Sequence, residues 1–332
     1  MKVLVTGGGG FLGQAICQRL VARGDTVHSF QRTRSAALDD LGVTQHLGDI
    51  RDRAAVHAAA DWCDAVVHCA AKAGVTGRYR DFEQINIDGT RHVLSACARV
   101  GARLVHTSSP SVVHDGRDLE GVDESVPRAR RFLAAYPETK AVAEGLVLAA
   151  AGALVPAVAL RPHLIWGPGD PHFLPRFAAR HRWLWLLGGG DKIIDTTYID
   201  NAADAHLLAL DRLRPGSPLV GRAYFIAQGE PCTNAAWVNA LLAAAGLPPV
   251  RWRMPARAAR TAAALLELAC GLPGVPVEPP LTRFLVDQAG TAHWFDLSAA
   301  RRDLGYRPRV TMDEGLARLT DHLARRPDRT VL

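Results

Sequence analysis

The sequence of 332 residues lacks any apolar run long enough to cross a bilayer, which takes about 18 residues or more. Its six cysteines are well separated and include no Cys-x-x-Cys pair, which argues against a disulfide framework and against a zinc site. A strand pattern begins at residue 3, which leaves no room for a signal peptide. We therefore expect a cytoplasmic protein with reduced thiols and no bound metal.

Long runs of basic residues are also absent. The formal charge of +6 is mild for this length, and the two arginine clusters, at 128–131 and 325–326, are short. Proteins that bind nucleic acid usually carry a long basic run or a basic face, so we expect no nucleic-acid partner. A modest positive charge still favours an anionic cofactor or substrate.

Four consecutive glycines are the most informative feature that is present. They separate a short apolar strand, Val3–Val5, from a helical pattern over residues 12–23, and Gly7, Gly10 and Gly13 are spaced three apart. This spacing is typical of the turn that lets a backbone approach a pyrophosphate and a helix pack closely on a strand. The helix N-terminus adds free N–H groups and a positive dipole end. A glycine-rich turn without ligand is the alternative, but the strand before and the helix after favour a dinucleotide.

Strand and helix patterns then alternate through the first half of the chain. This alternation predicts an α/β fold, a Rossmann-type doubly wound parallel sheet, with a smaller, discontinuous C-terminal substrate domain. We place the dinucleotide-binding domain at residues 1–162 plus about 195–228, and the substrate domain at about 163–194 plus 229–332. The predicted strands are 26–30, 44–47, 65–69, 103–107, 157–161, 196–199 and 223–227. The predicted helices are 36–41, 54–60, 82–100, 138–151, 202–213, 235–245, 256–270 and 313–324, with a proline-rich stretch at 273–280.

The end of the second strand bears on the choice of cofactor. An acidic residue there usually binds the ribose 2′-hydroxyl of NAD, but this strand ends Ser29-Phe30-Gln31-Arg32. An arginine can pair with a 2′-phosphate and stack on adenine, so Arg32 favours NADP(H) over NAD(H). An ordinary surface arginine is the alternative. Asp49 and Ile50, after the third strand, could hold the adenine amine and ring.

Tyr136 and Lys140 are four residues apart at the entry to a predicted helix and should share one face. A nearby ammonium should lower the pKa of the tyrosine, which could then exchange a proton with a carbonyl oxygen. Tyr-x-x-x-Lys often occurs by chance, and it gains weight from Ser108-Ser109 after the fifth strand, where ligands bind in such folds. A serine hydroxyl there can hydrogen-bond the substrate oxygen.

These motifs together resemble the extended short-chain dehydrogenase/reductases, and within them the 3β-hydroxysteroid dehydrogenase-like branch. The matching residues span nearly the whole chain: Thr6-Gly7-x-x-Gly10-x-x-Gly13, Gly48-Asp49-Ile50, His68-Cys69-Ala70-Ala71, Asn86-Ile87-Asp88-Gly89-Thr90, Thr107-Ser108-Ser109, Tyr136-x-x-x-Lys140, Leu160-Arg161-Pro162, Gly167-Pro168-Gly169-Asp170, Tyr198-Ile199-Asp200-Asn201, Pro280-Leu281-Thr282-Arg283 and Asp303-Leu304-Gly305-Tyr306-x-Pro308.

The resemblance implies a proton donor/acceptor at Tyr136, a lysine at 140 that also holds the nicotinamide ribose, and a substrate-orienting serine at 109. It implies that Asn86 is structural. The full set of implied cofactor-binding residues is Gly7, Gly10, Phe11, Leu12, Gly13, Arg32, Asp49, Ile50, Ala70, Ala71, Ser108, Tyr136, Lys140, Pro162, His163 and Ile165. Val113-His114 stands where the sugar-nucleotide epimerases have Tyr-Gly, and Pro110 follows the serine without an acidic pair. Both departures weaken a nucleotide-sugar substrate.

The opening residues 1–32 are also similar to the bacterial 2-alkyl-3-ketoalkanoic acid reductases of long-chain olefin biosynthesis. This resemblance implies NADPH-dependent reduction of the 3-keto group to a 2-alkyl-3-hydroxyalkanoic acid. A 3β-hydroxysteroid or sterol dehydrogenase is an alternative. An NADP-sensing regulatory protein is an alternative of another class, but it would be expected to lack Tyr136 or Lys140.

An apolar keto acid would suit the tryptophan-rich second half, where Trp183–Leu187 is the stretch most expected near ligand. Its carboxylate needs a cation, and the sequence leaves four candidates open: His163, His172, Arg176 and Arg180. Helix 256–270 could lie on a membrane or on a partner enzyme of the same lipid pathway, although packing on the sheet is the simpler reading. The resemblance implies a homodimer through helices 82–100 and 138–151.

Overall fold

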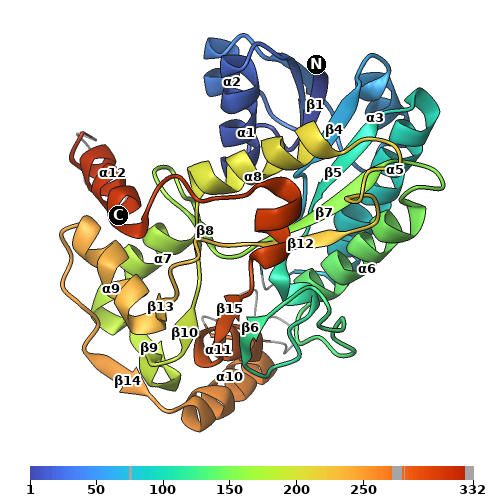
Figure 1. Ribbon diagram of the computed structural model, residues 1–332. Coiled ribbons are helices and arrows are strands. Elements are labelled where there is room, and N and C mark those ends of the chain that lie inside the picture. Colours follow the sequence, from blue (N-terminus) through green and yellow to red (C-terminus); the bar gives the residue numbers. More distant parts are fainter. Residues whose placement is uncertain (75–76, 271–278, 280, 326–332) are drawn as a thin grey trace.

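The computed structural model describes residues 1–74, 77–270, 279 and 281–325 (Figure 1). The expected proline-rich stretch at 273–280 lies outside the described residues except for Pro279. Pro280 of the late motif and Arg326 lie outside them as well.

A seven-stranded sheet, parallel throughout, forms the centre of the N-terminal half. Residue alternation along its strands explains why both faces are covered: Val3 and Val5 of β1 point to one core, and Leu4 points to another on the opposite face. The predicted fold class is therefore confirmed. In spatial order the strands are β12 (Ala223–Ile226), β7 (Ala157–Pro162), β5 (Arg103–Thr107), β4 (Ala65–His68), β1 (Lys2–Thr6), β2 (Thr26–Gln31) and β3 (Thr44–Leu47).

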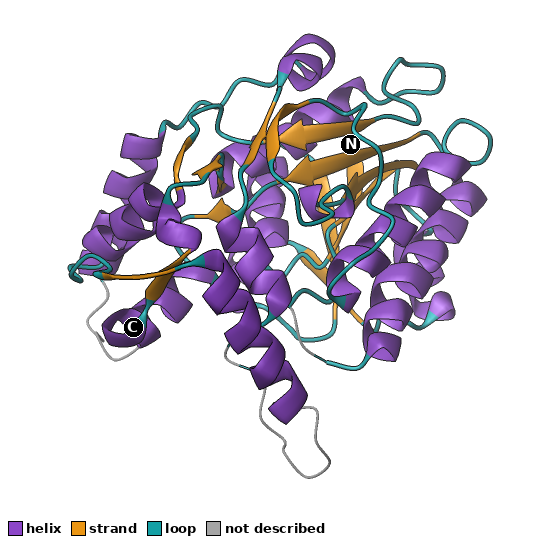
Figure 2. Cartoon of the chain, turned by 90° about the horizontal axis from the view of Figure 1, so that it is seen from below, coloured by secondary structure: helices purple, strands orange, loops and turns teal. Residues whose placement is uncertain are grey.

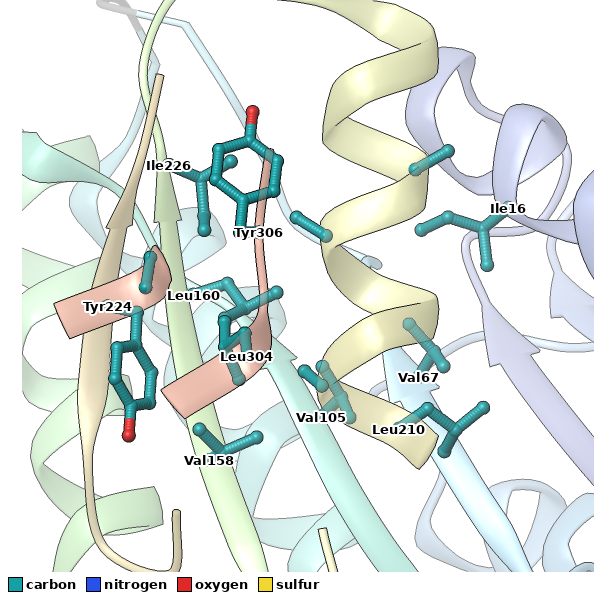
Figure 3. Close-up of a cluster of buried hydrophobic side chains, with 14 of the residues drawn as sticks. Ile16, Val67, Val105, Val158, Leu160, Leu210, Tyr224, Ile226, Leu304 and Tyr306 are labelled. Carbon is teal, nitrogen blue, oxygen red and sulfur yellow. The ribbon is translucent and has the colours of Figure 1, made fainter. Parts of the chain in front are cut away.

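Helices pack on both faces of this sheet, as Figure 2 shows for the layers of purple helices around the orange strands. One face is covered by α1 (Phe11–Ala22), α2 (Ala36–Asp40) and α8 (Ile199–Arg212). The other is covered by α3 (Arg53–Ala60), α5 (Gly89–Val100) and α6 (Ala135–Ala150). Figure 3 shows α8 lying over the sheet, where Leu210 shares one core with Val67 and Val105.

A smaller set of elements lies beyond the C-terminal edge of the large sheet (Figure 1). Its strands form three groups: β13 (Cys232–Thr233), β10 (Ile193–Ile194), β15 (His293–Phe295) and β6 (Leu119–Val122) in one sheet, β11 (Thr197–Tyr198) with β8 (Ile165–Trp166), and β14 (Trp252–Met254) with β9 (Trp185–Leu187). Its helices are α7 (Phe173–Arg180), α9 (Asn234–Ala244), α10 (Ala256–Cys270), α11 (Arg283–Gly290) and α12 (Met312–Ala324). The sequence analysis missed two helices of this set, α7 and α11, and most of its strands, namely β6, β8, β9, β10, β13, β14 and β15.

The predicted helix over 82–100 is interrupted. A short helix α4 (Tyr79–Phe82) leads into a π-helical turn, Glu83–Asp88, before α5 begins. The wide turn places Asn86 inside, where Oδ1 accepts from Lys72 N at 2.7 Å and Nδ2 donates to Lys72 O at 3.1 Å and to Thr139 Oγ1 at 3.0 Å. Asn86 thereby ties the chain after β4 to α6.

The two predicted domains share segments. Strand β6 lies within residues 1–162 but pairs with β15 in the small sheet. Conversely, Tyr306, from the predicted substrate domain, is fully buried in the core of the large sheet and donates its hydroxyl to Ala227 O at 3.0 Å (Figure 3). The division at residue 162 stays a prediction.

Candidate active site

The glycine turn joins β1 to α1 as the spacing predicts. Gly7 has φ of +72°, and a Cβ on Gly13 would lie 2.1 Å from Gly7 O, so any larger residue would push α1 off the strand. The first turn of α1 has no capping side chain and no acidic residue. Its N–H groups and dipole are therefore available to an anion.

A cavity of about 520 Å³ lies beside this turn. Of the predicted cofactor residues it is lined by Gly7, Gly10, Arg32, Asp49, Ile50, Ala70 and Ala71. Unpredicted lining residues are Gly9, Phe30, Gln31, Thr33, Arg34, Ser35, Gly48, Cys69, Lys72 and Ile85. The volume of this cavity, the glycines that line it and the uncapped N-terminus of α1 fit a bound dinucleotide.

Two arginines, Arg32 and Arg34, follow the end of β2, whereas the sequence analysis predicted a role for Arg32 alone. Arg34 forms two 2.8 Å bonds with the Asp39 carboxylate, while Arg32 is exposed on the cavity wall. Asp49 is the one acidic residue among the described lining residues, and Arg51 holds its carboxylate at 2.6 and 2.9 Å. That ion pair holds the pKa of Asp49 below its usual range.

Several predicted cofactor residues do not line this cavity. Phe11 and Leu12 of α1 pack against the core of the smaller half. Pro162 ends β7 and Ile165 begins β8. His163 is buried, with Nδ1 2.6 Å from Asp195 O, and burial lowers its pKa to about 4. It is thus a neutral ring bonded to the backbone.

Ser108 also has a different environment from the one implied. Its hydroxyl is buried and donates to Glu144 Oε2 at 2.6 Å. Arg161 forms a bidentate ion pair with the same carboxylate, with Nε–Oε2 and Nη2–Oε1 distances of 2.8 Å. Both charged side chains are buried. Ser108 therefore belongs to a buried ion-pair group under α6.

Ser109, Tyr136 and Lys140 meet at the carboxyl end of β5. Ser109 accepts from Ser111 N at 3.2 Å and hydrogen-bonds the Tyr136 hydroxyl. The Lys140 ammonium donates to Thr107 O at 2.5 Å. The structure thus brings together the three residues that the sequence singled out.

The electrostatics of this group differ from the sequence expectation. Burial raises the pKa of Tyr136, and the hydrogen bond with Ser109 offsets only part of that rise. Burial also lowers the pKa of Lys140 to about 8, against the attraction of Cys69 and Glu144. Desolvation of the phenol is the largest influence in the protein alone, so the expected lowering of the Tyr136 pKa by Lys140 is not observed there.

A second cavity, of about 510 Å³, lies between α7, α9 and α11. Its wall is mainly apolar, with Phe173, Phe177, Trp237 and residues 184–187. Three of the four candidate cations line it, namely His172, Arg176 and Arg180, whereas His163 does not. Among the described residues, Lys72 is common to the two cavities, and no sequence motif points to it.

Comparisons with known proteins agree with this geometry. The family model of the 3-beta hydroxysteroid dehydrogenase/isomerase family matches residues 4–256. The chain belongs to this family.

Two curated relatives are similar over nearly the full chain. A 2-alkyl-3-oxoalkanoate reductase from Stenotrophomonas maltophilia is 49% identical and covers 96% of this chain and 98% of its own. One of the same name from Shewanella oneidensis is 47% identical, with 95% and 84% covered. Among solved structures, UDP-glucuronic acid 4-epimerase from Bacillus cereus in complex with NAD superposes with a TM-score of 0.75 at 22% identity, covering 98% of this chain and 99% of that one, which shows the fold.

Turnover by this family member should fall as the pH rises through about 8. Lys140 carries its charge below that pH and loses it above, because burial lowers its pKa to about 8. Tyr136 keeps its proton throughout this range, because burial raises its pKa. The check is kcat/KM measured from about pH 6 to pH 10, with circular dichroism at each pH to confirm folding. A profile that stays flat up to about pH 10 would show that turnover does not require the charge of Lys140.

Proposed function

We propose that the protein reduces the 3-keto group of a 2-alkyl-3-ketoalkanoic acid with NADPH, in long-chain olefin biosynthesis. The apolar cavity beside the cofactor cavity carries this proposal, since aromatic and aliphatic walls suit alkyl chains and cations on its wall suit a carboxylate. The two bacterial relatives, both named 2-alkyl-3-oxoalkanoate reductase, support it.

The roles of Ser109, Tyr136 and Lys140 follow from their positions. NADPH, when bound, supplies the hydride. Tyr136 gives its phenolic proton to the carbonyl oxygen, and its raised pKa keeps that proton in place until charge develops on the oxygen. Ser109, which already hydrogen-bonds Tyr136, orients the substrate oxygen. Lys140 holds the nicotinamide ribose and favours proton release from Tyr136.

A 3β-hydroxysteroid or sterol dehydrogenase, acting in the oxidative direction, is the second candidate, and the family's name favours it. A sterol without a carboxylate would use the same triad, but it would offer no anion to the cations on the cavity wall. An NADP-sensing regulator would need neither Tyr136 nor Lys140, and the presence of both residues disfavours this alternative.

The experiment that tests this function is NADPH oxidation with a 2-alkyl-3-ketoalkanoic acid beside a 3-ketosteroid. We expect the keto acid to be reduced and the steroid to react at least about 100-fold more slowly. Tyr136→Phe should lose at least about 100-fold in kcat, the usual contribution of a general acid, while its affinity for NADPH stays nearly intact. Faster turnover of the steroid would assign the site to the sterol alternative, and unchanged activity of Y136F would remove the mechanism.

A preference for NADPH is part of the proposal, supported by Arg32 on the cavity wall and by the absence of an acidic residue at the end of β2. Arg32→Ala should weaken NADPH binding about 10- to 100-fold, the worth of a charge-assisted hydrogen bond, and change NADH binding by less than about 3-fold. Arg34→Ala is the matched variant, and its effect should be smaller because Asp39 already pairs with Arg34. Fluorescence titration gives both dissociation constants. Equal losses for the two cofactors would rule out a 2′-phosphate contact.

We further propose a homodimer through α5 and α6, as in the resembling family, and cooperation with other enzymes of the same pathway. The mass in solution tests the dimer. No helix in the described part of the chain is long and apolar enough to cross a membrane. We propose cytoplasmic residence, with peripheral membrane contact through the tryptophan surface, defined here as Trp183, Trp185 and Trp252.

The tryptophan surface combines apolar exposure with positive charge. Trp183 and Trp252 are 81% and 57% exposed, and the rings of Trp185 and Trp252 lie 5.6 Å apart on β9 and β14. Exposed arginines, Arg182 and Arg251, are their neighbours in the chain. Tryptophan and arginine together are typical of protein surfaces that bind anionic lipid headgroups. Trp185 also lines the apolar cavity, so this surface adjoins the proposed substrate site.

Sedimentation with lipid vesicles tests this contact. We expect binding to phosphatidylglycerol vesicles that weakens at high salt, little binding to phosphatidylcholine vesicles, and a loss of at least about 10-fold in the double variant Trp183→Ser/Trp252→Ser. Leu154→Ser is the matched control, because Leu154 is 69% exposed in the turn between α6 and β7. Equal binding of wild type and the double variant would refute the proposal.

A further inference from the structure

Lys72 occupies a position that no motif assigns. Among the described residues it is the one that lines both the cofactor cavity and the apolar cavity. It follows Ala71 in the loop after β4, and its side chain is half-buried. A cation at the junction of two cavities can contact a ligand in either one, close to the place where the two ligands meet.

The backbone of Lys72 is held in a fixed relation to the proton-transfer group. Asn86 bonds both the N–H and the carbonyl of Lys72, and its Nδ2 also donates to Thr139 Oγ1. Thr139 lies between Tyr136 and Lys140 on α6, and its hydroxyl bonds Tyr136 O at 3.1 Å. One amide side chain therefore connects Lys72 to the turn of α6 that carries Tyr136.

The ammonium of Lys72 has no acidic partner among the described residues. Its Nζ lies 5.0 Å from the centre of the Phe82 ring, a contact that accommodates a cation without neutralising it. The other cations of the apolar cavity, His172, Arg176 and Arg180, belong to α7 or its N-terminal end and do not line the cofactor cavity. Lys72 is thus the cation nearest the cofactor side of the apolar cavity.

The chemistry of a 3-keto acid decides which cation is suitable. Only one carbon separates its ketone carbon from its carboxylate, so a carboxylate anchor must lie close to the place of hydride transfer. A cation deeper along the alkyl cavity would pull the ketone away from the cofactor. We propose that Lys72 binds the substrate carboxylate and so fixes the ketone in register with Tyr136, an inference that rests on the proposed function.

The test compares a 2-alkyl-3-ketoalkanoic acid with its neutral methyl ester. Lys72→Met should lower kcat/KM for the acid about 10- to 100-fold, mainly through KM, because a charge-assisted bond is lost. The ester should change by less than about 3-fold, and Lys72→Arg should recover most of the activity on the acid. NADPH affinity, measured by fluorescence titration, should stay within about 3-fold, which also shows that the variant is folded.

Four results would overturn the inference. Equal loss on acid and ester together with weaker NADPH binding would assign Lys72 to the cofactor's phosphates. Loss of acid selectivity in Arg176→Met but not in Lys72→Met would assign the carboxylate to α7. Wild-type protein that reduces neither acid nor ester would remove the proposed function and the inference with it, whereas wild-type activity on both with an unaffected Lys72→Met would remove the inference alone.

Discussion

The buried pair of Glu144 and Arg161 fixes the relation between α6 and the centre of the sheet. Arg161 lies on β7 and Glu144 on α6, and Ser108, just after β5, donates to the same carboxylate. Removing one partner of such a pair typically costs about 3–5 kcal/mol, because it leaves an unpaired charge in a dry interior. Two neighbouring strands and the helix are thereby fixed to one another. Lys140 lies one turn before Glu144 on that helix, and Tyr136 one turn before Lys140, so the pair sets the height of the proton-transfer group above the sheet.

The large sheet could be predicted from the sequence because each of its elements has a local signature. Buried parallel strands such as Val3–Val5 are continuous apolar runs, and Gly7, Gly10 and Gly13 have a spacing that few other structures require. The grouping of Ser109 with Tyr136 and Lys140 could be expected because Ser109 follows the carboxyl end of β5, where ligands bind in such folds, and because residues four apart on a helix share one face. The topology of the sheet determines where these residues lie, and that topology could be predicted from the sequence.

Contacts between segments far apart in the chain could not be predicted from the sequence. The strands of the small sheet are two to four residues long and pair segments far apart in the chain, as β6 does with β15. The burial of Ser108 against Glu144 depends on elements 36 residues apart, and nothing in Thr107-Ser108-Ser109 distinguishes the buried serine from the one facing the site. The direction of the Tyr136 pKa also depends on how dry the site is, which only the packed structure determines. Lys72 had no motif at all, since its importance arises from where two cavities meet.

The π-helical turn at Glu83–Asp88 has a consequence for how this chain can change. A π-helical turn holds one more residue than an α-helical turn, and each residue rotates an α-helix by about 100°. Deleting a single residue within the turn would straighten the helix and rotate α5, carrying Val93 and Cys97 out of the core and Asn86 away from Lys72. The length of this segment is therefore constrained more tightly than the identity of most of its residues, and insertions or deletions should be far more damaging here than substitutions on its outer face.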